Sequence, residues 1–413
     1  MIALSLDEVA TLAAGDLDPA PGASEITGLQ VDSRRIVPGD LFVAVGRGVE
    51  FLEDARARGA AATLVPEVPF EALAALGAAV RARSRARVVG ITGSTGKTST
   101  KDILAALCAP AVRTVAAEAS YNNEVGVPLT LCRLGNDTEV CILELAMRGF
   151  GQIADLCRIA RPDIGVVTNV GPVHLELVGS IEGVVRAKSE LVAALPPGGT
   201  AIVPAELPVG RTDIDVVRLG EPESASDDGR TVVDGVSFNF TARHQAANAA
   251  AALATLDALG LPRPDRVEVE FSRWRGEELP LPGGGLLVND AYNANPVSMR
   301  AALAHLLEIA EGRRRVAVLG DMAELGPGGP AFHRQIGEEA ARQGVQALVA
   351  VGELARGYLD GADGVPLKRW AAGAADAIAA VEELVQPGDC VLVKASRSVG
   401  LERVADALAA VST

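Results

Sequence analysis

The stretch Gly90-Ile91-Thr92-Gly93-Ser94-Thr95-Gly96-Lys97-Thr98 follows the apolar pair Val88-Val89 and precedes a segment of helical character, residues 99–108. This order predicts a strand, a Gly-rich turn and a helix N-terminus, which aim backbone N–H groups and a helix dipole at one point. Such a point suits phosphate oxygens, so the stretch predicts a nucleotide site. The glycine spacing departs from the strict Walker pattern, and a plain strand-to-helix turn is the alternative that these residues alone leave open.

The composition indicates some classes of protein and excludes others. The chain has 413 residues, of which 49% are apolar and only 3% aromatic, which is typical of a soluble α/β protein with two to four domains. Its net charge is -15, so a general nucleic-acid binder is excluded, because its own field would repel the ligand. Anionic ligands must therefore be met by local cations.

The sequence gives no sign of a membrane segment or an oxidising compartment. No run of 18 apolar residues occurs, and the N-terminus lacks the basic and apolar regions of a signal peptide, so we expect a cytoplasmic protein without membrane insertion. The cysteines show no Cys-x-x-Cys spacing and most have apolar neighbours. We interpret them as reduced core residues, not as disulfide or zinc partners. They are Cys108, Cys132, Cys141, Cys157 and Cys390.

Residues 1–85 alternate short strands and helices, with strands expected at 40–45 and 61–65 and a helix at 69–80. The turn that contains Ser33 and Arg34 offers a hydroxyl, a guanidinium and backbone donors to a diphosphate or a sugar. An ordinary polar turn is an equal alternative. The alternating arginines at 81–87 are interpreted as a solvated linker.

From residue 86 the strand and helix pattern is typical of a parallel sheet. Apolar runs at 140–143 and 164–167 end in Glu144 and in Thr168-Asn169, and polar residues at the carboxyl ends of parallel strands lie where such sheets bind ligands. Glu144 is therefore a candidate metal ligand beside the phosphates. A solvated carboxylate at a strand end is the alternative.

The following segments add weaker candidates. His174 lies in a turn, where a histidine is usually structural, and Lys188 lies on an amphipathic helix, where a lysine usually belongs to a solvated face. Residues 196–240 predict an edge or an insertion, and 243–259 predict a long Ala-rich helix. Gln245 and Asn248 share one face of that helix, where they would read an adenine edge or cap the helix. Residues 274–413 predict a doubly wound domain.

Together these stretches resemble the Mur ligase family of ATP-dependent amide-forming enzymes. The similar stretches follow the family order across nearly the whole chain. They are residues 92–98, 121–129, 144–149, 168–176, 187–190, 290–296 and 319–326. Within the family, Tyr292-Asn293-Ala294-Asn295-Pro296 and Gly320-Asp321-Met322-Ala323-Glu324-Leu325-Gly326 favour the branch that adds a dipeptide.

The resemblance implies an α/β fold of three domains. Residues 1–85 would bind the UDP-sugar peptide, 86–273 would form a central P-loop ATPase with a mostly parallel sheet, and 274–413 would form a Rossmann-like domain for the incoming dipeptide. The implied reaction joins D-alanyl-D-alanine to UDP-N-acetylmuramoyl-tripeptide through an acyl-phosphate, with ATP and Mg²⁺, in peptidoglycan precursor synthesis. We expect a monomer.

The resemblance also implies roles for individual residues. The nucleotide would be bound by Gly93, Ser94, Thr95, Gly96, Lys97, Thr98, Ser99, Gln245, Asn248, Arg275 and Asp290, and the peptide substrate by Ser33, Arg34, Asn122 and Asn123. Mg²⁺ would be bound by Thr98, Glu144, His174 and Lys188, the last as a carbamate. The catalytic set would be Lys97, Glu144, His174, Lys188 and Arg275.

The sequence departs from the family pattern in places, for example at Asn289, where Asp is common, and three alternatives are open. The short segment before Arg243 predicts a central domain without a hairpin there, and residues 48–51 replace a longer turn near the expected uridine site. A ligase that adds the third amino acid and a folylpolyglutamate-type ligase would keep the chemistry. An ATP-binding protein without ligase activity would not.

Overall fold

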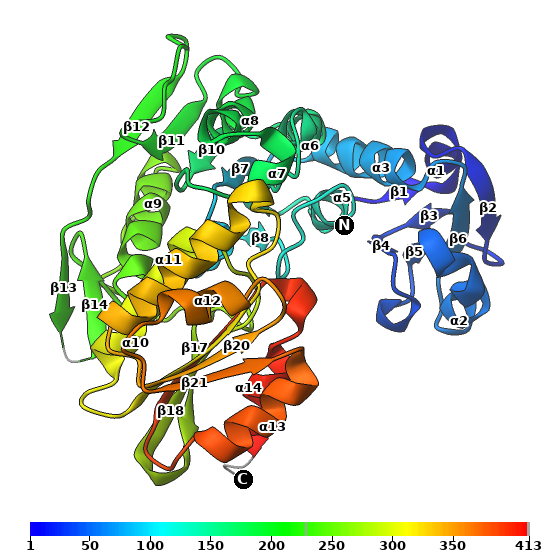
Figure 1. Ribbon diagram of the computed structural model, residues 1–413. Coiled ribbons are helices and arrows are strands. Elements are labelled where there is room, and N and C mark those ends of the chain that lie inside the picture. Colours follow the sequence, from blue (N-terminus) through cyan, green and yellow to red (C-terminus); the bar gives the residue numbers. More distant parts are fainter. Residues whose placement is uncertain (228, 411–413) are drawn as a thin grey trace. The chain divides into compact units, whose positions relative to one another are not determined.

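The computed structural model describes residues 1–227 and 229–410 (Figure 1). The described chain divides into two compact units. The first contains Met1–Asn169, Arg186–Phe240 and Ala246–Glu270, and the second contains Val170–Val185, Thr241–Gln245 and the chain from Phe271 onward. The α/β fold class is as expected from the sequence.

The first unit begins with a small mixed sheet of strand order β2-β6-β5-β4, in which only the β2 and β6 pair is antiparallel. Its elements have these bounds: β1 Leu4–Ser5, α1 Leu6–Leu12, β2 Gly15–Pro19, β3 Glu25–Ile26, β4 Gly28–Gln30, β5 Asp40–Val43, α2 Leu52–Ala57, β6 Ala62–Pro66 and α3 Pro69–Arg83. The interpretation of 81–87 as a solvated linker is wrong for Arg81. Its guanidinium is largely buried and donates to the backbone of Ala160 and Arg161 and to Asp163, because α3 continues to Arg83.

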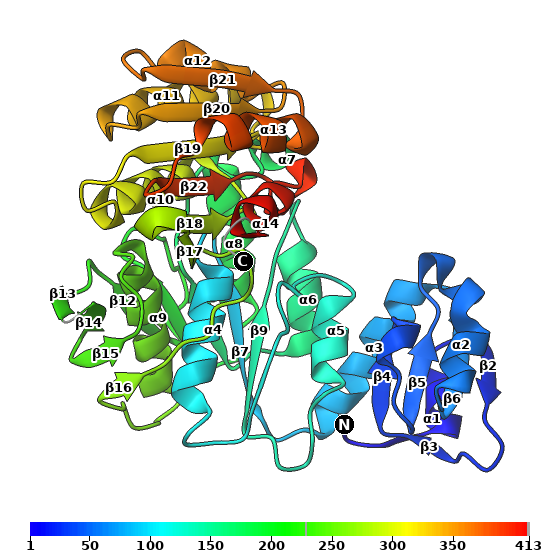
Figure 2. The ribbon, with the colours of Figure 1, turned by 90° about the horizontal axis from the view of Figure 1, so that it is seen from below.

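The central sheet of this unit is parallel throughout, with strand order β12-β11-β10-β7-β9-β8. Helices α4 and α9 lie on one side of it and α5 and α6 on the other (Figure 2). Strands covered on both faces need near-continuous apolar runs, and β7, β9 and β10 are buried along almost their whole length. The bounds are β7 Arg87–Thr92, α4 Lys97–Cys108, β8 Thr114–Ala116, α5 Gly126–Leu131, β9 Val140–Glu144, α6 Gln152–Ala160, β10 Ile164–Val167, α8 Ile181–Ala193, β11 Thr200–Pro204, β12 Asp215–Leu219 and α9 His244–Ala258.

Residues 196–240 form the expected edge, because β12 ends the central sheet, but the prediction that this region lacks a hairpin is wrong. A second sheet has the order β13-β14-β15-β16, with β13 Ser224–Asp227, β14 Arg230–Val233, β15 Val236–Phe238 and β16 Arg266–Val267. Strands β14 and β15 pair antiparallel across Asp234 and Gly235, both of positive φ. An Asp-Gly pair between apolar runs favours this tight hairpin turn, so the sequence did carry the signal.

The second unit is built on a sheet of order β17-β18-β22-β19-β20-β21, parallel except for the β17 and β18 pair. Alternate residues of β19 enter different cores. Ala317 and Leu319 pack with α10, α11 and α12, and Val316 and Val318 pack with α13 and α14. The expected doubly wound arrangement is therefore confirmed. The bounds are α7 Leu175–Val178, β17 Glu277–Leu281, β18 Gly285–Asp290, α10 Pro296–Ile309, β19 Arg315–Gly320, α11 Gly329–Arg342, β20 Ala347–Val351, α12 Arg356–Gly361, β21 Leu367–Ala371, α13 Ala374–Leu384, β22 Cys390–Lys394 and α14 Glu402–Ala410.

Within the described part of the chain, no helix combines the length and the apolar character needed to cross a membrane.

Candidate active site

The Gly-rich turn between β7 and α4 requires glycine at two positions. Gly93 has φ +152° and Gly96 has φ +79°. A Cβ added at Gly93 would lie 1.8 Å from Thr168 Oγ1, and one added at Gly96 would lie 2.1 Å from Asn248 Oδ1. Only glycine fits both the backbone angles and this crowding. Helix α4 begins at Lys97, directly after Gly96, so its first N–H groups open onto the turn.

The two residues that directly follow β10, Thr168 and Asn169, hold the Gly-rich turn in place. Strand β10 pairs with β7 so that Val167 lies opposite Thr92, which brings Thr168 and Asn169 beside the turn. The Asn169 amide accepts from Thr95 N at 2.9 Å and donates to Thr95 Oγ1 at 2.6 Å. The Thr168 hydroxyl donates to Thr95 O at 2.5 Å. These bonds fix the turn to the end of β10.

Glu144 connects α4, the helix that follows the Gly-rich turn and is called the P-loop helix below, with the turn that contains Asn122. Strand β9 also pairs with β7, with Glu144 opposite Ile91. Glu144 is buried, and its carboxylate accepts from Thr98 Oγ1 at 2.8 Å and from Asn122 Nδ2 at 2.8 Å. The neighbouring Lys97 ammonium donates to Gly93 O at 2.9 Å. A carboxylate, a hydroxyl and an ammonium thus lie together at the helix N-terminus, where phosphates bind.

Lys188 lies on α8 and is only 2% exposed. Burial, together with the positive charge of Lys97, lowers the pKa of Lys188 well below its ordinary value. The same helix is tied to α6 by Glu190, whose carboxylate accepts from Gly151 N at 2.7 Å and from Ala154 N at 3.1 Å. Lys188 is therefore a buried amine of lowered pKa on an anchored helix.

Other predicted nucleotide-binding residues, near or on α4 and on α9, are also buried. Ser94 and Ser99 are 6% and 8% exposed, and Asn248, on α9, is 7% exposed. Asn248 Oδ1 lies 3.5 Å from the hydroxyl of Thr100 on α4. Gln245, three residues before Asn248, is 5% exposed. Asn123 Oδ1 accepts from Gly126 N, in the first residue of α5, at 3.0 Å.

In the second unit, three predicted residues have specific partners. His174 has φ +53° and its Nδ1 contacts the carboxylate of Glu324. The Arg275 guanidinium lies 3.9 Å from the ring centroid of Tyr292. Asp290 lies opposite Lys394 in the pairing of β18 and β22, and its carboxylate accepts from Lys394 Nζ at 2.6 Å.

The predicted residues of the N-terminal sheet differ in exposure. Ser33 is buried, and its hydroxyl bonds to Asp54 and lowers the pKa of that carboxyl. Arg34 is exposed and pairs with Asp32, whose pKa falls to about 2 mainly through the hydrogen bond from Arg34. The next residue, Arg35, donates instead to Glu118 at 2.6 Å and to the Tyr121 hydroxyl at 3.2 Å.

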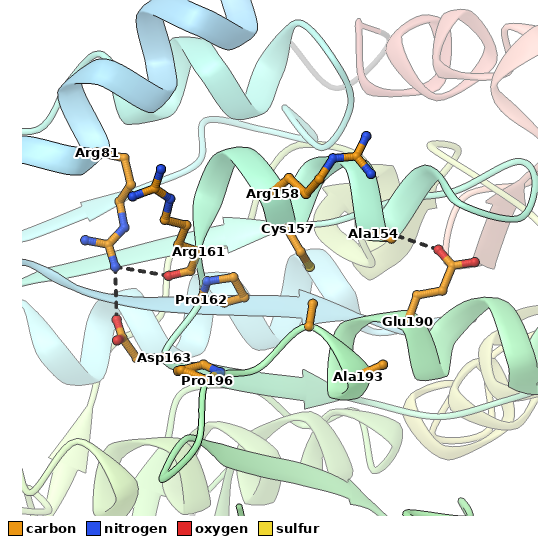
Figure 3. A pocket seen from close by; sticks show the side chains of 11 residues that line it. Arg81, Ala154, Cys157, Arg158, Arg161, Pro162, Asp163, Glu190, Ala193 and Pro196 are labelled. Carbon is orange, nitrogen blue, oxygen red and sulfur yellow. Dashed lines mark hydrogen bonds and ion pairs between the residues drawn. The ribbon is translucent and has the colours of Figure 1, made fainter. Parts of the chain in front are cut away.

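A separate pocket of about 850 Å³ lies at the opposite end of the central sheet (Figure 3). Arg81, Arg161 and Asp163 line it, and Asp163 accepts from Val88 N at the start of β7. Because ligands of parallel sheets bind at the carboxyl ends of the strands, this pocket is not the expected nucleotide site.

The donor groups at the start of α4 include oxygen atoms of the kind that bind metal ions. Among residues 1–227 and 229–410, no group of three or more His, Cys, Asp and Glu side chains gathers in a way that would hold a metal ion. The hydroxyl of Thr98 and the carboxylate of Glu144 nevertheless supply the oxygen donors that Mg²⁺ prefers, beside the expected phosphate position.

Comparison with known protein families agrees with this geometry. The Mur ligase middle domain model matches residues 91–256, and the model described as "Mur ligase, glutamate ligase domain" matches residues 274–397. The chain belongs to the Mur ligase family. The UDP-N-acetylmuramoyl-tripeptide--D-alanyl-D-alanine ligase of Synechocystis sp. is 35% identical over 447 residues, which cover 98% of this chain and 98% of that protein.

Solved structures of Mur ligases share the fold. MurF from Acinetobacter baumannii is 27% identical, with a TM-score of 0.85 over 99% of each chain. MurF from Thermotoga maritima, solved in complex with ADP, is 27% identical, with a TM-score of 0.78 over 93% of this chain and 97% of that one.

The structure adds residues to this Mur ligase that local sequence patterns did not assign. Thr168 and Asn169 were expected only as strand-end polar residues, and the motif stretches contained Glu190 and Glu324 without a role for either. Lys394, the last residue of β22, was given no role. The strand order would have indicated the partners of the strand-end residues. It places β10 and β9 on either side of β7, and it places β22 beside β18.

Proposed function

We propose that this chain is an ATP-dependent ligase that joins D-alanyl-D-alanine to UDP-N-acetylmuramoyl-tripeptide in peptidoglycan precursor synthesis. The observation that carries the proposal is the hydrogen-bonded chain Thr98, Glu144, Asn122. It connects the phosphate-binding helix with the turn expected to meet the peptide. The full-length similarity to dipeptide-adding ligases supports the choice of substrates.

The phosphates are bound by the Gly-rich turn. Residues 93–99 surround them, the backbone N–H groups of residues 96–99 at the start of α4 face them, and Lys97 neutralises the β- and γ-phosphate oxygens. The contact between Lys97 and Gly93 O aims the ammonium at this turn. Gln245 and Asn248 flank the adenine, and Arg275 and Asp290 contact ATP from the C-terminal domain.

Mg²⁺ would be held by Thr98 and Glu144, with a second ion held by His174 and by Lys188 as a carbamate. Bound there, Mg²⁺ would neutralise the charge that accumulates on the transferred phosphoryl group. Lys188 suits the carbamate because its pKa is lowered by burial, and only the neutral amine attacks CO₂. The new N–C bond makes a carboxylate and releases one proton, which turns a cation into an anion.

The reaction has two steps. A terminal carboxylate oxygen of the tripeptide attacks the γ-phosphorus, and ADP leaves. The amine nitrogen of D-alanyl-D-alanine then attacks the acyl carbon, phosphate leaves with the bonding electrons, and the amine loses its proton. Lys97 stabilises charge in the first step, while Asn122 and Asn123 orient the peptide, so positioning supplies much of the rate.

The proposal includes the organisation of the whole chain. Residues 1–85 bind the UDP-sugar peptide with Ser33 and Arg34, 86–273 bind ATP, and 274–413 bind the dipeptide. The enzyme acts as a cytoplasmic monomer.

A coupled assay with defined precursors tests the function. We expect phosphate release and one amide product only when ATP, UDP-N-acetylmuramoyl-tripeptide and D-alanyl-D-alanine are all present. Parallel reactions replace the acceptor and amine by UDP-N-acetylmuramoyl-dipeptide with a diamino acid, or by a folate with glutamate. Product from either of those pairs alone, or tight ATP binding with no amide product, would contradict the proposal.

A further inference from the structure

Lysine is rare in this chain, and its positions are not random. Only five of the 38 basic residues are lysines, and the others are arginines. Lys101, Lys188 and Lys394 are buried, Lys97 lies in the P-loop helix, and Lys368 is exposed. Lys97 and Lys188 have roles in the proposed function and Lys394 pairs with Asp290, which leaves Lys101 as a buried cation without a function.

Lys101 lies on α4, one helical turn after Lys97, and is only 3% exposed. Its ammonium donates to Ala117 O at 2.8 Å and to Ala119 O at 3.1 Å. It also pairs with Asp102 Oδ1 at 2.8 Å. A buried ammonium is stable only if its donors are satisfied, and here acceptors from two segments meet at one nitrogen.

The carbonyls that Lys101 binds belong to a bent segment. Ala119 has φ +44°, a conformation that residues other than glycine adopt at an energetic cost. The segment then turns, with Tyr121 N donating to Glu118 O, and leads directly to Asn122 and Asn123. The far side of this turn is held by the bond from Asn122 to Glu144.

We propose that Lys101 is a positioning residue that fixes residues 117–123 relative to the P-loop helix, so that the peptide-binding turn keeps one geometry at the γ-phosphate. This inference rests on the proposed function for the role of Asn122 and Asn123. Lys101 reaches the turn from the same helix that carries Lys97 and Thr98. Phosphate and peptide groups are thereby ordered by one rigid element.

The choice of lysine follows from the shape of this site. The acceptors converge on a single nitrogen, and a compact ammonium presents three donors from one atom. An arginine spreads its donors over a plane, so it would not bond to both carbonyls and Asp102 without displacing them.

The test compares Lys101→Met with Lys368→Met, which removes an exposed lysine that has one backbone contact to Leu359 O. Lys101→Met should raise the KM for the UDP-tripeptide about tenfold or more, the effect of losing charged hydrogen bonds. Affinity for a non-hydrolysable ATP analogue should change less than about threefold. Lys368→Met should change neither value.

Hydrogen exchange supplies a readout that a general loss of stability would not reproduce. In Lys101→Met, peptides covering 117–123 should exchange faster, while peptides covering β10 keep their rates. In the Asn122→Ala background, Lys101→Met should raise the KM little further, because both changes act on one turn. A uniform rise in exchange, or an unchanged KM for the peptide, would overturn the proposal.

If Lys101→Met does not fold, Lys101→Arg takes its place with the same expectation, and unchanged exchange at 117–123 then overturns the proposal. The proposed function fails separately, if the unaltered chain forms no amide product. The exchange measurement still decides in that case whether Lys101 holds the turn.

Discussion

Lys188 and Lys394 are buried to the same extent, each 2% exposed, but their surroundings differ. The Lys394 ammonium donates to Asp290 Oδ2 at 2.6 Å and to Asn293 O at 2.8 Å. Burial lowers the pKa of Lys394, and the charge of Asp290 opposes that shift. For Lys188, burial and the charge of Lys97 both lower the pKa.

Because of this difference, we expect Lys394 to be a charged group with a structural role and Lys188 to be a reactive group. Lys394 keeps an anion beside it and ties the turn after β18 to the end of β22. Lys188 has a cation as its neighbour, so its neutral form is favoured, and a neutral amine is a nucleophile. The predictions below test this contrast.

The largest effect is expected for Lys188→Ala, which should lower the ligation rate by about 10³-fold, since it removes a preorganised charge at the phosphoryl group. Because the missing group is an anion, added formate or acetate should restore part of the rate. Steady-state assays with increasing carboxylate measure this. Lys368→Ala is the control and should behave like the unaltered chain, and an absence of rescue at any carboxylate concentration would remove the carbamate from the mechanism.

The next largest effect concerns stability and differs between the two lysines. Lys394→Met leaves Asp290 without its cation and should lower the free energy of unfolding by about 3 kcal/mol. Lys188→Met replaces a buried amine by an apolar side chain and should cost little or add up to about 1 kcal/mol. Urea unfolding of both variants, in the absence of CO₂, gives the comparison. Equal losses would mean that Lys188 also has a strong partner in the folded chain.

Much of this site was predictable because its signals are local. The Gly-rich turn, the strand ending in Glu144 and the helix carrying Lys188 are contiguous stretches, and each lies where it was expected. The start of α4 differs, at Lys97 instead of Ser99, because Gly96 in the left-handed conformation begins the helix earlier.

The partners of these residues were not predictable, because they depend on strand order. Glu144 meets Thr98 only because β9 lies beside β7, although β8 comes between them in the sequence. The pairing of Lys394 with Asp290 has the same origin, since 104 residues separate them. Arg34 and Arg35 show a further limit of prediction from the sequence. A pattern of residue types does not tell which of two adjacent arginines faces the Tyr121 hydroxyl, and only Arg35 does so.

A pH series distinguishes the neutral amine from a paired one. Because the pKa of Lys188 is lowered in the folded chain, the unfolded chain binds more protons between that lowered value and the ordinary value of 10.5. Stability relative to Lys188→Met should therefore rise with pH across this window, by at most about 1.4 kcal/mol per pH unit, and stay constant below it. Unfolding without CO₂, Mg²⁺ and nucleotide measures the difference. A difference that falls with rising pH would mean that an anion stabilises the Lys188 ammonium.

The smallest effect tests whether the helix around Lys188 matters beyond the lysine itself. Glu190→Gln weakens the cap on α6, because a neutral amide oxygen replaces the carboxylate that accepts from Gly151 N and Ala154 N. We expect a loss of about 1 kcal/mol in unfolding free energy and less than a tenfold loss in ligation rate. Glu338→Gln, on the exposed face of α11, is the control.

Small effects are expected at Glu190 because its removal loosens one contact between α8 and α6, while the apolar neighbours of Lys188 on α8, Val184, Ala187 and Leu191, keep that helix buried. If Glu190→Gln lost as much activity as Lys188→Ala without losing stability, Glu190 would itself take part in the reaction. Lys188 and Lys394 would then both have a neighbouring carboxylate, and the two lysines would differ in what that carboxylate does. They would no longer differ in whether an anion lies beside them.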